Sequence, residues 1–166
     1  MADKIQDALS GIGQYKPIPW EMIPDLGLYM DQVITFISKT YAPLYGEDMH
    51  TYISPAMINN YVKGKLIPRP TGKKYNREQI ALLTMIVALK QVSTMDDIRR
   101  MIAIPEGESV EHLYTTFCQR FQWVIQALQN AESSAFGPLA TALDFAILSS
   151  GFRAGCEAVL KSEPEV

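Results

Sequence analysis

The spacing of apolar residues predicts a mostly helical chain. Between Leu28 and Tyr41 the apolar positions recur every three or four residues, which is the period of an amphipathic α-helix. Pro43 and Gly46 are expected to end this helix, and proline does so because it removes a backbone hydrogen bond. From Asn76 to about Val92 the chain is strongly apolar, which is typical of a helix buried in a core.

Two shorter helices are indicated by capping residues. Ser54 can accept hydrogen bonds from the free N–H groups of a first turn, and Pro55 suits the first helical position. This helix is expected to reach about Lys63. Thr94 and Asp97 have the spacing of a capping box and predict the start of another short helix.

The segment after the helix at 54–63 is predicted to form a small β wing. Gly64 is expected to take the left-handed conformation that ends a helix, and Pro68 and Pro70 prevent the helix from continuing. The residues on either side of the Thr71-Gly72 turn then favour a hairpin.

Two longer helices are predicted in the C-terminal part, at Val110–Asn130 and Leu139–Leu160, separated by Gly137-Pro138. The tract from Leu139 to Phe152 is the longest apolar one and predicts a buried helix. It is well short of the roughly 20 residues that a membrane span requires. The last helix is also rich in small residues, so that another helix could approach it closely.

The first 25 residues are rich in glycine and proline and predict a loosely ordered arm. Trp20, Met22 and Ile23 are expected to hold this arm to the body, because large apolar side chains are seldom left in water. The predicted organisation is an arm, a central domain and a C-terminal helical region for dimerisation or ligand binding, at residues 1–25, 26–105 and 106–166.

The composition is that of an ordinary globular protein, with 48% hydrophobic and 20% charged residues in 166. The two cysteines, Cys118 and Cys156, are far apart and predict neither a metal site nor a disulfide. The N-terminus lacks the pattern of a signal peptide. We therefore expect a cytoplasmic protein that has reduced thiols, no cofactor and no membrane association.

The net charge of −3 conceals one strongly positive segment. Between Tyr61 and Arg77 there are six basic residues and no acid, which leaves nine basic residues against all 18 acids elsewhere. The six are Lys63, Lys65, Arg69, Lys73, Lys74 and Arg77. A positive patch on an otherwise acidic protein predicts an anionic partner. The alternative is a solvated, charged hairpin without a ligand.

A short helix followed by a basic wing is a device for holding double-stranded DNA, because the helix can enter the major groove while the wing binds phosphates. On this helix Ile58 and Tyr61 should pack inward, which points Asn59, Asn60 and Lys63 outward. Asparagine can pair with adenine, and lysine with guanine or phosphate. The sequence therefore predicts a transcriptional regulator that binds double-stranded DNA.

No catalytic constellation is predicted, so we do not expect an enzyme. Glu111, His112 and Cys118 could form a thiol site, but His112 and Cys118 are six residues apart on one predicted helix and point to different faces. His50 stands alone in a loop. A second hypothesis is an adaptor protein whose basic wing binds an acidic protein, and a small-molecule effector site between the C-terminal helices is compatible with the DNA-binding hypothesis.

The same residues resemble the DNA-binding domain of MerR-type regulators. The resemblance lies in the runs Ser54-Pro-Ala-Met-Ile-Asn-Asn-Tyr-Val-Lys-Gly-Lys-Leu-Ile-Pro68, Lys73-Lys-Tyr-Asn-Arg-Glu-Gln-Ile80 and Thr94-Met-Asp-Asp-Ile98. Those domains have a recognition helix that ends near a Gly-Leu-Leu/Ile-Pro turn, a basic wing with a tyrosine, a long helix and a Ser-Leu-Glu-Glu-Ile segment. The resemblance implies a mainly α fold, a MerR-like winged helix-turn-helix with a small β wing, followed by a C-terminal helical extension. It also implies homodimers on palindromic DNA.

More closely, three blocks resemble the bacterial domain-of-unknown-function family eighteen thirty-six, which is described only as MerR-like. They are Asp31-Gln-Val33, Met57-Ile-Asn-Asn-Tyr-Val-Lys63 and Lys90-Gln-Val92. Within the MerR pattern, Tyr61, Lys73 and Tyr75 match by type. Asn59 and Asn60 replace an arginine and a tyrosine, and Lys65 takes the usual glycine position. The predicted DNA-binding residues are Ser54, Asn59, Asn60, Tyr61, Lys63, Lys65, Arg69, Lys73, Lys74, Tyr75 and Arg77.

The connection between Tyr41 and Ser54 is much longer than the turn of a helix-turn-helix, which has three to four residues in that motif. The first helix is therefore expected to dock differently, or a short helix is expected within the connection.

Overall fold

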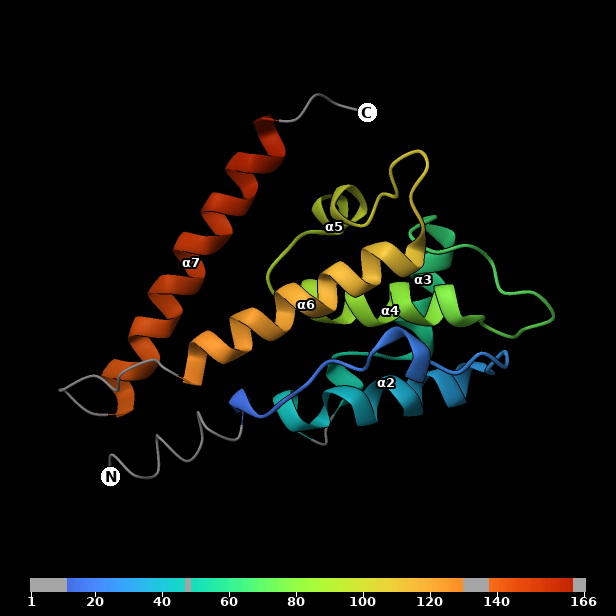
Figure 1. Cartoon of the computed structure of the whole chain (residues 1–166), viewed down its shortest axis with the longest axis horizontal. Helices are drawn as coiled ribbons and strands as arrows, with labels where there is room; N and C mark the ends of the chain where they lie inside the picture. Colours follow the sequence, from blue (N-terminus) through green and yellow to red (C-terminus); the bar gives the residue numbers. More distant parts are fainter. Residues whose placement is uncertain (1–11, 47–48, 130–137, 163–166) are drawn as a thin grey trace.

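The computed structural model describes residues 12–46, 49–129 and 138–162. In these residues it has six α-helices and two 3₁₀ helices, in the order η1 (Trp20–Met22), α2 (Met30–Tyr45), η2 (Met49–Thr51), α3 (Pro55–Lys63), α4 (Arg77–Leu89), α5 (Met95–Met101), α6 (Val110–Gln129) and α7 (Pro138–Ser162). Figure 1 shows α4 between α2 and α6, with α7 diverging from this group.

Helix α4 is the centre of the core, as its apolar sequence predicts. Every residue from Gln79 to Ala88 is buried. Asn76 caps the helix by accepting a hydrogen bond from the Gln79 backbone (2.9 Å), and the Gln79 side chain accepts one from the Asn76 backbone (2.8 Å). The Tyr41 hydroxyl of α2 donates to the Thr84 carbonyl oxygen (2.9 Å), which joins the two helices inside the core.

Both predicted capping residues are confirmed. The Ser54 hydroxyl accepts a hydrogen bond from the Met57 backbone at 3.4 Å, and the helix that it caps runs to Lys63. The Thr94 hydroxyl accepts one from the Asp97 backbone at 3.2 Å, at the start of α5. These helix starts are local features, because a cap and its partner are only three residues apart.

Of the two residues expected to end the first helix, Pro43 does not do so, since α2 continues to Tyr45, whereas Gly46 does. In the last turn a proline removes one hydrogen bond, and ring packing here offsets that loss: the Tyr45 and Tyr52 rings stack with centroids 4.9 Å apart. Gly46 ends the helix, with a φ of 81° and an N–H that donates to the Ala42 carbonyl oxygen (2.9 Å). The expected short helix in the connection is present as η2.

The predicted winged helix-turn-helix with a small β wing is also wrong. No strand occurs in the described part of the chain, where the only strand-like features are isolated bridges between Leu28 and Tyr75 and between Thr71 and Lys74. The tight turn expected at Thr71-Gly72 does form, because the Lys74 N–H donates to the Thr71 carbonyl oxygen (3.1 Å). The turn is not extended into a hairpin.

The reason lies in the backbone groups on either side of this turn. Thr71 and Lys74 form the hydrogen-bonded pair at the turn, so the next hydrogen-bonded pair of a hairpin would join Arg69 to Asn76. The Asn76 backbone is instead used at the start of α4, where its N–H donates to the Gln79 side chain (2.8 Å) and its carbonyl oxygen accepts from the Ile80 N–H (3.0 Å). The backbone groups of Tyr75 point away from the other side of the turn and bond to Leu28, with N–O distances of 2.8 and 3.0 Å. A ladder of more than one bridge therefore cannot form.

The described part of the N-terminal arm packs on the body, whereas the sequence predicted a loose arm. The Tyr15 ring is buried against Tyr41 and Phe121, with centroids 6.2 and 5.8 Å away. The Tyr114 hydroxyl of α6 donates to the Ile18 carbonyl oxygen at 2.8 Å. Aromatic rings from the arm, α2 and α6 thus form one cluster at this end of the core.

Of the three residues expected to hold the arm, two do so. Ile23 is buried, and the Trp20 ring lies 6.2 Å from the Tyr114 ring. Met22 is 69% exposed, so its predicted role is wrong. It belongs to η1, in which it follows Trp20 by two residues and therefore points to a different side.

Helix α7 differs most from the sequence-based expectation. Its Cys156 sulfur lies 3.9 Å from the Met101 sulfur of α5, and Arg100 of α5 donates to the Leu160 carbonyl oxygen. The apolar tract that predicted a buried helix is nevertheless exposed: Phe152 is 75% and Ile147 is 61% accessible. In the described part of the chain, no helix has the length and apolar character that crossing a membrane requires.

Candidate nucleic-acid interface

Helix α3 presents a polar face to solvent. Ile58 and Tyr61 are buried under it, while Asn59, Asn60 and Lys63 are exposed. The inward and outward directions predicted from the helical period are therefore confirmed. Two amide side chains and one ammonium group lie on the exposed face of a nine-residue helix.

Helix α3 ends in a left-handed residue, but this residue is Lys65 and not the expected Gly64. Lys65 has a φ of 57°, whereas Gly64 has a φ of −76°. The Lys65 N–H donates to the Val62 carbonyl oxygen (3.1 Å) and the Leu66 N–H to the Tyr61 carbonyl oxygen (2.9 Å). This is the Schellman pattern, in which glycine normally takes the position of Lys65.

Arg99 of α5 fixes the end of α3, which the sequence did not reveal. Its guanidinium donates to the Gly64 carbonyl oxygen (2.9 Å) and is held in turn by Asp96 (2.8 Å). A cation is favourable at a helix C-terminus, where carbonyl groups lack partners. The sequence does show two basic residues, Arg99 and Arg100, in the last turn of the predicted helix that begins at Thr94. It does not show that Arg99 binds the carbonyl oxygen of Gly64.

The basic loop, residues 64–76, connects α3 to α4 and extends away from the helices (Figure 1). Where it leaves α3, an open hollow of about 400 Å³ is lined by three cations and three apolar residues, which are Lys63, Lys65, Arg69, Val62, Ile67 and Pro68. Three positive side chains around one hollow suit an anion of the size of a phosphate group.

Five exposed cations make up what we call the basic surface: Lys63, Lys65, Arg69, Lys73 and Lys74. In the described residues none of the five has a carboxylate within 4.0 Å, and the ion pairs that do occur involve other side chains. The Lys74 ammonium group lies over the Tyr29 ring, 5.1 Å from its centroid. This contact holds the ammonium group in place without neutralising its charge. The described residues therefore leave the positive charge of this surface uncompensated.

Arg77, the sixth cation, lies apart from the basic surface. Its Nε donates to the Ile23 carbonyl oxygen (3.0 Å), its guanidinium is 3.8 Å from the Asp25 carboxylate, and it lies over the Trp20 ring. These contacts hold the N-terminal segment to α4. The geometry favours a structural role for Arg77 over the predicted phosphate contact.

Ser54, Tyr61 and Tyr75 also support the interface from behind. Ser54 caps α3, and both tyrosine rings are buried. Burial raises the pKa of Tyr61 and of Tyr75 above the ordinary tyrosine value. The structure thus leaves seven of the eleven predicted residues exposed and brings three of them, Lys63, Lys65 and Arg69, together around one hollow. The other four exposed residues are Asn59, Asn60, Lys73 and Lys74.

Two lysines of the basic surface have strained backbones. Among the described non-glycine residues, Lys65 (φ 57°) and Lys73 (φ 65°) alone have a positive φ. Gly72, which precedes Lys73, has a φ of 58°, so both central residues of the Thr71–Lys74 turn are left-handed, as in type I′ turns. A left-handed lysine costs about 1–2 kcal/mol, and strain of this kind is concentrated at functional sites.

Lys65→Gly is expected to stabilise the fold by about 1 kcal/mol while weakening anion binding about fivefold. Glycine removes the strain at φ 57°, and the lost ammonium removes about one phosphate contact. Thermal unfolding and binding to a 20-base-pair duplex measure the two effects. Lys63→Gln is the matched control, because it removes a neighbouring charge without relieving strain. A weaker fold or unchanged binding in Lys65→Gly would contradict the assignment.

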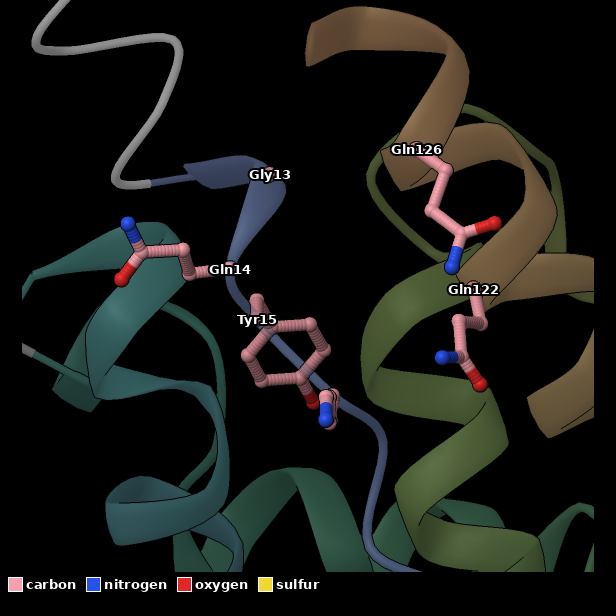
Figure 2. Close-up of a pocket in the computed structure, with 6 residues that line it drawn as sticks. Gly13, Gln14, Tyr15, Gln122 and Gln126 are labelled. Atoms are coloured by element: carbon pink, nitrogen blue, oxygen red, sulfur yellow. The ribbon is translucent and has the colours of Figure 1, made fainter.

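A second hollow, of about 420 Å³, lies between residues 13–16 and α6. Figure 2 shows Gln122 and Gln126 of α6 on one side and Gln14 and Tyr15 on the other. The sequence placed an effector site between the two C-terminal helices, whereas this hollow involves the N-terminal segment. The small-molecule effector stays a prediction.

The side chains considered for a thiol site are not arranged as one. The Cys118 thiol lies 3.6 Å from the Ile18 carbonyl oxygen, and burial raises its pKa, which reduces the thiolate fraction. His112 lies 3.9 Å from the Glu108 carboxylate. In the described residues no three His, Cys, Asp or Glu side chains are grouped as metal ligands.

Of the comparisons with known proteins, only the comparison with protein families gives a match. No curated protein and no solved structure matches the chain. The family model described as Domain of unknown function (DUF1836) matches residues 18–117. The matched region starts just before η1, ends within α6 and includes the whole basic surface. Because the match covers more than half of the chain, this protein belongs to the DUF1836 family.

Proposed function

We propose that this protein binds double-stranded DNA through α3 and the basic surface, and regulates transcription. The observation that carries the proposal is the group of five exposed cations, for which the described residues provide no carboxylate partner. The rest of the chain has a net negative charge, with ten basic residues against 18 acids, and would be repelled by DNA, so the basic surface also sets the orientation of binding.

Helix α3 would read bases while the cations bind phosphates. The major groove is about 12 Å wide and admits an α-helix, and Asn59 and Asn60 have the side-chain amides that pair with adenine. Lys63 lies at the end of the same face and lines the hollow together with Lys65 and Arg69. A phosphate in that hollow would place the start of the basic loop against one DNA strand.

The sequence of residues 54–68 supports a transcriptional role, because it resembles the recognition helix and turn of MerR-type regulators. The β wing of those proteins is not formed in this chain, so the likeness concerns α3 and the turn that follows it. In our proposal, the basic loop supplies phosphate contacts through isolated side chains on a tight turn.

The alternative function is an adaptor that binds an acidic protein through the same basic surface. Charge alone does not separate the two functions. DNA is favoured because the exposed amides of α3 lie beside the cations, and amide side chains pair with base edges. An acidic protein partner would need only the positive charges.

Selection of bound duplexes from a random library tests the function. We expect the chain to retain duplexes at 50 mM salt and to enrich a common motif, because α3 reads base edges. Asn60→Ala should relax the motif at one or two positions, since a lost bidentate contact removes about 1–3 kcal/mol of discrimination. Gln14→Ala, which removes an exposed amide far from α3 in the sequence, is the control. If no duplex binds even at low salt, the DNA-binding function is wrong.

A further inference from the structure

Large apolar side chains are exposed along α7. Leu143, Ile147, Leu148, Phe152 and Val159 are between 53% and 75% accessible. Single exposed apolar residues are common on protein surfaces, but a continuous row on one helix is not. A helix of 25 residues with this apolar character is normally buried, and α5 is too short to cover it.

These five side chains share one face. At 3.6 residues per turn they lie within about half of the circumference of α7, on either side of Gly151 and Gly155. A Cβ atom added at either glycine would meet nothing within 4 Å, so both glycines face open space. The charged side chains of Arg153 and Glu157 pair with each other at 3.1 Å on another side of the helix. Among the side chains that the structure describes, the outward face therefore has a shallow glycine groove between apolar ridges.

We propose that this face of α7 binds α7 of a second copy of the chain. The five side chains expose on the order of 500 Å² of apolar surface, taking roughly 100 Å² for each. A stable dimer buries about 800 Å² on each partner, of which roughly 65% is apolar, so the five side chains supply about the apolar area that self-association needs.

The shape of the face selects an identical partner. A two-fold interface uses the same surface twice, so the surface must complement itself. The α7 face has both elements of such a fit, because the ridge containing Leu148 and Phe152 of one copy can enter the groove at Gly151 and Gly155 of the other. Glycine lets two helix backbones approach closely, which increases the contact made by the flanking side chains.

The proposed self-association does not depend on DNA binding, but it would affect how two α3 helices are placed for DNA binding. In α5, Arg100 donates to the Leu160 carbonyl oxygen of α7, and the adjacent Arg99 donates to the Gly64 carbonyl oxygen at the end of α3. Helix α5 thus connects the self-associating helix to the DNA-reading helix. In a dimer the two α3 helices would have a fixed separation, as binding to two half-sites requires.

Sedimentation of the full chain tests the proposal without DNA. We expect a mass of about twice 18.6 kDa at micromolar concentration. Ile147→Glu with Phe152→Glu should raise the dissociation constant by at least about 100-fold, because it places unpaired charges in the interface. Both residues are exposed in one copy, so helix content and thermal unfolding at low concentration should not change.

Two further variants complete the test. Met22→Glu changes an equally exposed apolar residue outside α7 and should leave the dimer intact. Gly151→Leu fills the groove and should weaken the dimer without adding charge. A monomer at all accessible concentrations would overturn the proposal, as would a doubly substituted variant that stays dimeric. Either result can occur with DNA binding intact, so the two proposals fail separately.

Discussion

Neutralising the whole basic surface is expected to weaken duplex binding by on the order of 10³-fold at 0.15 M salt. The variant combines five substitutions, Lys63→Gln, Lys65→Asn, Arg69→Gln, Lys73→Asn and Lys74→Gln. Each phosphate contact releases about 0.9 of a counterion, so the binding constant falls steeply with salt in proportion to the number of contacts. Asparagine is used at the two left-handed positions because it tolerates a positive φ.

The salt dependence is the sharper measurement. With five contacts the logarithm of the binding constant should fall with a slope of about −4.5 against the logarithm of salt, and the neutralised variant should have a slope near zero. The matched comparison is between two double variants. Lys73→Asn with Lys74→Gln should remove about two units of slope, whereas Lys39→Gln with Arg120→Gln, which alters two exposed cations on α2 and α6, should remove none. Equal slopes in the two double variants would refute the assigned surface.

Local sequence signals predicted the helix starts well. Ser54 and Thr94 each cap a helix through a backbone group three residues away, so the interaction needs no information about the rest of the fold. The same holds for the outward direction of Asn59 and Asn60, which follows from helical periodicity once Ser54 fixes the start.

The errors arose where distant residues decide the outcome. Tyr45 stacks on Tyr52 where α2 continues past Pro43, and the backbone of Tyr75 pairs with Leu28, which is far away in the sequence. Neither partner is identified by the pattern of the segment it affects. The exposure of α7 is a third case. Its apolar composition predicts that other side chains cover the helix, but it does not tell whether those side chains come from the same copy of the chain.

The sequence predicted the positive charge of the candidate site, but it did not show which of the cations are free to bind a ligand and which have a structural role. Counting cations identified six residues, and the structure separates Arg77 from the other five because Ile23, Asp25 and Trp20 surround it. Arg99 was missed for the opposite reason. It is outside the charged segment, and only the fold brings it to the Gly64 carbonyl oxygen.

Raising the pH above about 10 is expected to unfold the protein through three tyrosines. Burial raises the pKa of Tyr15, Tyr41 and Tyr114 well above the ordinary value of 10.0. Above pH 10 the folded state therefore keeps three protons that the unfolded state releases. The contribution of these three tyrosines to the free energy of unfolding is fully present below pH 10 and is lost as the pH rises. As the pH rises from 10 towards the folded-state pKa values, each tyrosine costs about 1.4 kcal/mol per pH unit.

Three tyrosines together cost about 4 kcal/mol per pH unit, and a domain of this size has a stability of about 5–15 kcal/mol, so the fold should be lost within one to four pH units above 10. Circular dichroism should change together with the tyrosinate absorbance of the three buried rings, because these rings can ionise only when the core opens. Tyr114→Phe distinguishes this cause from general alkaline damage. It removes the hydrogen bond to Ile18 and should lower stability at pH 7, yet it should reduce the loss per pH unit by about a third, since one ionising group is gone. If the tyrosinate signal of all the rings appeared while the helical signal persisted, the aromatic cluster would be solvated rather than buried, and the packing of residues 12–23 on α6 would have to be reconsidered.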